Sequence, residues 1–95
     1  MNQDNIYNEA LKKFGYRKQL LMMIKEMSEL TQAILKQFRM SDTFFYTDAI
    51  IEEMADVDIM LMELKSGLDT DGIKIYENVY CDKLYRLSNL INEEK

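Results

Sequence analysis

Apolar residues recur along the chain at the three- and four-residue spacing of an α-helix, and turn residues divide them into four segments. We expect helices over residues 5–13, 16–39, 48–66 and 72–92. The chain has no proline, and its three glycines stand at the segment boundaries. No linker, repeat or low-complexity tract separates the segments. The pattern therefore predicts one all-α domain, residues 1–95, arranged as a four-helix bundle.

Capping residues set the expected helix ends. Asp4 or Asn5 can cap the first helix, and Gly15 stands where that helix should stop. Gly67 should end the third helix, and Asp71 is the expected cap of the fourth. The intervening stretch MSDTFFYT reads as a loop or short turn with three candidate caps: Ser41, Asp42 and Thr47.

The second and third helices each carry two distinct lines of residues when wound at about 100° per residue. In the second helix the expected core stripe is Leu20, Met23, Ile24, Met27, Leu30, Ile34 and Phe38. Its second line, with steps of four, three and four, is Met22, Glu26, Glu29 and Ala33. In the third helix the expected core stripe is Ile50, Met54, Val57, Leu61 and Leu64. Its second line has identical steps: Ala49, Glu53, Asp56 and Met60.

The two second lines contain four acids, which we call the acidic quartet: Glu26, Glu29, Glu53 and Asp56. Helices joined by a short loop usually pack antiparallel, so these lines can face each other. At roughly 5 Å and an effective dielectric near 20, each pair of charges would repel by on the order of 3 kcal/mol. A divalent cation resolves this repulsion, and oxygen ligands alone favour Mg²⁺, with Mn²⁺ as a second choice.

A single pair of acids three residues apart is usually a solvated helix face. Two such pairs on matching lines, each bracketed by Met and Ala rather than by Lys, favour a metal site. One alternative stays open, a contact between subunits in which the acids meet Lys25 or Lys36.

Charge and composition narrow the possible functions. The 95 residues carry a net charge of −5 with no dense run of Lys or Arg, which argues against nucleic-acid binding. We expect no signal peptide, and no apolar run reaches the roughly 18–20 residues that span a bilayer. The single Cys81 fits a reducing cytoplasm, where we expect the protein.

Histidine is absent, which excludes a Ser–His or Cys–His nucleophile pair and a His-ligated zinc. The isolated glycines form no phosphate-binding loop. Any catalysis must therefore come from carboxylates, Lys or Arg, hydroxyls or a hard metal ion.

Two stretches, KEMSELTQAILK (25–36) and EEMADVDIMLMEL (52–64), resemble the MazG-like family of all-α nucleoside triphosphate pyrophosphohydrolases. The signature of that family is EExxE, a spacer and EExxD, and the spacer here has the usual length. KFGYRKQL (13–20) looks like the usual lead into the first motif. KLYRL (83–87) is similar to the last helix of the short, phage-type members, so the resemblance covers about residues 6–90.

The resemblance implies an oligomeric helical bundle that binds Mg²⁺ through the acidic quartet. It also implies hydrolysis of a nucleoside triphosphate between the α- and β-phosphates, which yields a nucleoside monophosphate and pyrophosphate. Glu52 matches the leading acid of the second motif. The leading Glu of the first motif is Lys25 here, so metal binding is a safer expectation than turnover.

Several residues are candidates for roles in this reaction. Glu26 or Glu52 would orient the attacking water. Lys83 and Arg86 would contact phosphates, and Gln19 would read a base edge; each also has a plain reading as a surface residue. The aromatic residues that could stack on a base, or instead pack in the protein, are Phe14, Tyr16, Phe44, Phe45 and Tyr46.

The third helix carries a further apolar line outside its core stripe: Ile51, Ala55 and Met62. A helix that is apolar on several sides is enclosed by neighbours, and one chain of this length supplies few. We therefore expect a homo-oligomer, dimer or tetramer, that associates through the second and third helices.

Two other functions remain open. A catalytically weak or inactive helical module that binds nucleotide or partner helices would account for Lys25. A carboxylate-pair hydrolase such as a glycosidase would need no metal and would stay active in EDTA.

Overall fold

The computed structural model describes residues 2–40 and 46–93, and all regular structure in them is helical. The helices are α1 (Gln3–Phe14), α2 (Tyr16–Met40), α3 (Asp48–Ser66) and α4 (Thr70–Glu93). The predicted all-α class and the four helices are thereby confirmed, with boundaries that differ from the expected ones by one or two residues. Phe44, Phe45, Ser41 and Asp42 lie outside the described residues. No helix in the described part of the chain is long and apolar enough to cross a membrane.

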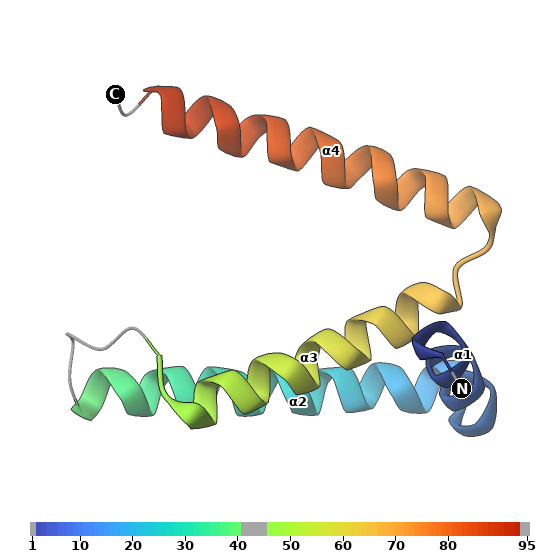
Figure 1. Cartoon of the computed structure of the whole chain (residues 1–95), viewed down its shortest axis with the longest axis horizontal. Coiled ribbons are helices and arrows are strands. Elements are labelled where there is room, and N and C mark those ends of the chain that lie inside the picture. The colour runs from blue at the N-terminus through green and yellow to red at the C-terminus, as the bar shows by residue number, and fades with distance from the viewer. Residues whose placement is uncertain (1, 41–45, 94–95) are drawn as a thin grey trace.

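Three helices pack together and the fourth diverges from them. α2 and α3 form an antiparallel pair, and α1 lies across one end of it, mainly against α3 (Figure 1). α4 leaves that end and runs away from α3 as a long arm (Figure 1). The radius of gyration is 16.5 Å, against about 12 Å for a compact chain of this length. The arm therefore makes the molecule open rather than globular.

Helix caps explain most of the boundaries and correct two predictions. Asn2, not Asp4 or Asn5, caps α1, because its side chain accepts the N–H of Asn5. The α4 cap is Asp69, not Asp71, since Asp69 Oδ1 accepts the N–H of Gly72 at 2.7 Å. In each case the cap lies two or three residues nearer the N-terminus than expected.

The other expected caps are confirmed. Thr47 caps α3 by accepting the N–H of Ile50. Gly15 ends α1 with φ of 88° while its N–H bonds to the carbonyl of Leu11, and glycine adopts this conformation without a Cβ penalty.

The expected core stripe of α2 is not buried. Ile24, Met27 and Phe38 are 50–64 % exposed, and the acid-bearing second line faces α3 instead. In the described part of the chain the buried apolar residues are Leu11, Ile50 and Met60. α2 carries apolar residues on more than one side, so its pattern did not decide which side meets α3.

A close contact fixes the corner where α3 ends and α4 begins. Gly67 lies so near Leu11 and Tyr16 that a Cβ at this position would collide with the Leu11 side chain. The ammonium of Lys65 lies 4.4 Å from the centre of the Tyr76 ring. Asp4 and Tyr7 of α1 border the same corner together with Ile73 of α4. Lys65 on Tyr76 is thus the contact at this corner that joins α3 to the base of α4.

Candidate functional site

The acidic second lines of α2 and α3 face each other. Oxygen atoms of Glu26, Glu53 and Asp56 lie within 4.8 Å of one another. Glu29 comes from the same line of α2, and its charge contributes to the raised pKa of both Glu26 and Glu53. The predicted convergence of acids from two helices is therefore present in the structure.

The antiparallel register explains why these side chains meet. Glu26 is opposite Asp56, and one end of the pair brings Gln19 to Glu63, where the Gln19 amide donates to the Glu63 carboxylate. Gln19 precedes Glu26 by seven residues on α2, and Glu63 follows Asp56 by seven residues on α3. Seven residues are about two helical turns, so the pair Glu26–Asp56 and the pair Gln19–Glu63 both point into the contact between α2 and α3.

The surroundings of Glu26 and Glu53 disfavour negative charge on these two carboxyls. Burial, followed by the charges of Glu29 and Asp56, raises the pKa of Glu26 above its ordinary value of 4.5, and the neighbouring Lys25 lowers it only in part. Burial is also the largest cause that raises the pKa of Glu53, with contributions from Glu29, Asp56 and Glu26. Both carboxyls are therefore destabilised as anions in the absence of a cation.

Two carboxylate oxygens in this cluster have no hydrogen-bond donor. Oε2 of Glu26 and Oε2 of Glu53 are buried, and no described residue donates a hydrogen bond to either. A buried oxygen without a donor costs on the order of 1–3 kcal/mol, and more if it is charged. A cation bound between the two helices would supply the missing interaction.

These observations fit a hard divalent cation. The donor set is oxygen only, which suits Mg²⁺ and Mn²⁺. Glu26, Glu53 and Asp56 approach closely enough to hold one ion. Glu29, the fourth predicted ligand, is not in the group of oxygens within 4.8 Å that the described residues form, although its charge acts on Glu26 and Glu53. Asp56 is the exposed member, so this is the side from which a ligand would reach the ion.

The other candidate catalytic acid, Glu52, lies outside this cluster. It is exposed on α3 and does not join the group of oxygens within 4.8 Å that the described residues form. Its neighbour Glu53 points into the α2–α3 contact, and consecutive helical residues point about 100° apart. Glu52 therefore borders the cluster instead of belonging to it.

Gln19 has a partner within the chain. It is buried at 6 % exposure, and its amide donates to Glu63, which is 4 % exposed. This pair joins α2 to α3 and accounts for Gln19 without a ligand. Glu63 was missed by sequence reasoning, although one further step of three residues along the second line from Met60 reaches it.

The two basic candidates lie away from the acids within one chain. Lys83 and Arg86 are exposed on α4, which diverges from α2 and α3 (Figure 1). Their role as phosphate contacts stays a prediction.

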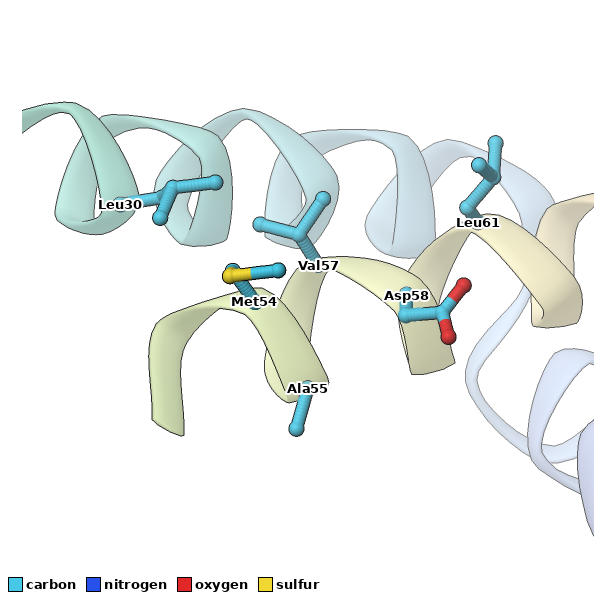
Figure 2. Close-up of a pocket in the computed structure, with 6 residues that line it drawn as sticks. All are labelled: Leu30, Met54, Ala55, Val57, Asp58 and Leu61. Carbon is cyan, nitrogen blue, oxygen red and sulfur yellow. The ribbon is translucent and has the colours of Figure 1, made fainter. Parts of the chain in front are cut away.

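An apolar groove runs along another side of the α2–α3 pair, and we call it the α2–α3 groove. It is lined by Leu30, Met54, Ala55, Val57, Asp58 and Leu61. Val57 and Leu61 point from α3 toward α2, and Leu30 comes from α2 (Figure 2). Around α3, Met54 and Leu61 lie about 140–160° from Asp56, so the groove and the acids occupy different sides.

Comparisons with known protein families, with curated proteins and with solved structures find no match to this chain. The functional argument therefore depends on the residues of this chain and their geometry.

Proposed function

We propose that this protein is a Mg²⁺-dependent nucleoside triphosphate pyrophosphohydrolase that cleaves between the α- and β-phosphates. The observation that carries the proposal is the meeting of Glu26, Glu53 and Asp56, with two buried oxygens that lack donors. The ordered motifs that resemble the MazG-like family support the same reaction. Mn²⁺ is an alternative ion for the same oxygen donors.

In the proposed reaction the residues of the chain have two roles, binding of the ion and orientation of the attacking water. Glu26, Glu29, Glu53 and Asp56 hold the ion, which when bound offsets phosphate charge and makes water more acidic. Glu26 or the bordering Glu52 accepts a hydrogen bond from the attacking water and aligns it with the α-phosphorus. Because the protein is acidic, with a net charge of −5, its own residues repel a free triphosphate.

A product assay tests the proposal. Purified protein is incubated with a panel of normal and damaged ribo- and deoxyribonucleoside triphosphates and Mg²⁺, and the products are separated by ion exchange. We expect nucleoside monophosphate and pyrophosphate in equal amounts. The substitution Glu53→Gln should abolish release, whereas Glu9→Gln, which removes an exposed acid on α1, should not. Orthophosphate alone, or no product with any triphosphate, would contradict the proposal.

Lys25 favours one alternative, a catalytically weak or inactive module that binds nucleotide or partner helices. Its ammonium acts electrostatically on Glu26, where the resembled family has another acid. Calorimetry with a non-hydrolysable triphosphate and Mg²⁺ would detect binding without turnover. A large gain in pyrophosphate release from Lys25→Glu would identify a weakened enzyme, and an unchanged rate would show that Lys25 is tolerated.

A further inference from the structure

α4 exposes an apolar stripe that the described part of the chain leaves about half exposed. The residues of this α4 stripe are spaced by seven, four, three and four positions and are each 43–55 % exposed: Ile73, Tyr80, Leu84, Leu87 and Ile91. This is the spacing of a helix face that packs against other helices. Beyond the corner at its base, α4 does not pack substantially against α1, α2 or α3.

The exposed area of the chain is too large for a monomer of its mass. The accessible surface is 7976 Å², whereas a folded monomer of 11.3 kDa exposes about 5,700 Å². The excess, about 2,200 Å² for each chain, lies within the roughly 1,000–2,500 Å² that each subunit of an obligate dimer buries. A large dimer contact of the obligate kind would therefore remove the excess.

The geometry points to an exchanged arm: we infer that the α4 stripe of one copy packs into the α2–α3 groove of a second copy, and the reverse. At the corner between α3 and α4, α4 is directed away from the α2–α3 pair of its own chain. This direction favours packing of α4 on a second copy over packing on its own groove. Lys65 of α3 lies over the Tyr76 ring at the base of α4, while Gly67 packs the end of α3 on Leu11 of α1. The groove supplies apolar side chains of both helices, Leu30 from α2 and Met54, Val57 and Leu61 from α3.

Charge also fits this pairing. Lys83 borders the α4 stripe, three residues after Tyr80 and four before Leu87. A cation in an apolar contact needs an anionic partner. The groove provides one in Asp58, an acidic residue among its lining side chains. The inference concerns the groove and not the acidic quartet, so it stands or falls independently of the proposed hydrolysis.

Light scattering after size exclusion gives the first test. The wild-type chain should have twice the mass of one chain, 11.3 kDa. Leu84→Glu on α4 and Leu61→Glu in the groove should each yield a monomer with helical circular dichroism retained. Asn89→Glu places the same charge on the opposite face of α4 and should leave the dimer intact. A monomeric wild type, or a dimer that survives both Leu→Glu substitutions, overturns the inference.

Cross-linking identifies the occupant of the groove and needs no destabilising charge. In a Cys81→Ser background, chains with Leu84→Cys are refolded together with chains with Met54→Cys and treated with a short bismaleimide. We expect a covalent product of one chain of each kind, and none when the Met54→Cys chain is treated alone. Cross-linking of two Leu84→Cys chains to each other would show that α4 packs on α4. A cross-link within a single chain carrying both substitutions, at high dilution, would show closure on itself. Either result overturns the inference.

Discussion

Glu26 of α2 and Glu53 of α3 meet across the contact between their helices, and each keeps one buried oxygen to which no described residue donates a hydrogen bond. Without a ligand this arrangement lowers the stability of the folded protein, because buried acids without hydrogen-bond donors repel each other and are poorly solvated. The arrangement is accounted for if the acids serve a ligand. The predictions below follow from this pair and from its neighbours.

A divalent cation should stabilise the folded protein. At a Mg²⁺ concentration a hundred times the dissociation constant, binding to the native state alone adds about 2.7 kcal/mol to the free energy of unfolding. For a domain of this size each kcal/mol raises the midpoint by about 4–8 °C. A thermal melt with Mg²⁺ or Mn²⁺ should show this rise for wild type and for Glu9→Gln, and not for Glu53→Gln. An equal rise in all three proteins would indicate that the ion binds elsewhere.

Acidification should stabilise the metal-free protein. The pKa values of Glu26 and Glu53 are raised in the folded state, so the native state binds protons more readily than the unfolded chain at pH values above 4.5. The two carboxyls therefore add to the free energy of unfolding at pH values below their pKa in the unfolded chain. This contribution is lost as the pH rises through their pKa in the folded protein.

Thermal melts in EDTA between about pH 5 and about pH 7 measure this effect. The midpoint should fall as pH rises through the window, and the fall should be smaller for Glu53→Gln, which cannot ionise at that position. Stabilisation by Mg²⁺ should have the opposite pH dependence, because the cation binds deprotonated carboxylates. Identical slopes for wild type and Glu53→Gln in EDTA would contradict the argument.

Lys25→Glu should tighten metal binding and destabilise the metal-free protein. Lys25 lowers the pKa of Glu26, and its replacement by an acid turns partial compensation into repulsion that a cation relieves. We expect a change on the order of 1 kcal/mol, or about fivefold in the Mg²⁺ dissociation constant. Calorimetric titration measures it. Lys25→Gln should lie between the two proteins, and Lys12→Glu on α1 should resemble wild type.

Gln19→Ala should destabilise the contact between α2 and α3. The substitution leaves the Glu63 carboxylate buried without the Gln19 donor, which should lower the free energy of unfolding by about 1–3 kcal/mol. Gln32→Ala, on the exposed side of the same helix, should cost less than about 0.5 kcal/mol. Urea titration measures both. Unchanged stability together with a raised KM for the triphosphate would instead restore the interpretation of Gln19 as a base-reading residue.

Periodicity in the sequence was sufficient to predict the helices and the acidic quartet. Caps and glycines are local signals, so Thr47, Gly15 and Gly67 marked helix ends correctly. The acids recur at matching steps on two helices, and a short connection makes those helices antiparallel. The pattern therefore allowed the acids to converge, although it did not decide between this packing and one through the apolar stripe.

Only the tertiary structure decided which sides of the helices pack. α2 is apolar on several sides, and hydrophobic periodicity does not rank such sides when more than one can be buried. Tertiary contacts turn the acid-bearing line toward α3 and join Gln19 to Glu63, and α4 diverges from the α2–α3 pair after Gly67. These features depend on contacts between residues distant in sequence, which a pattern read along one helix does not contain.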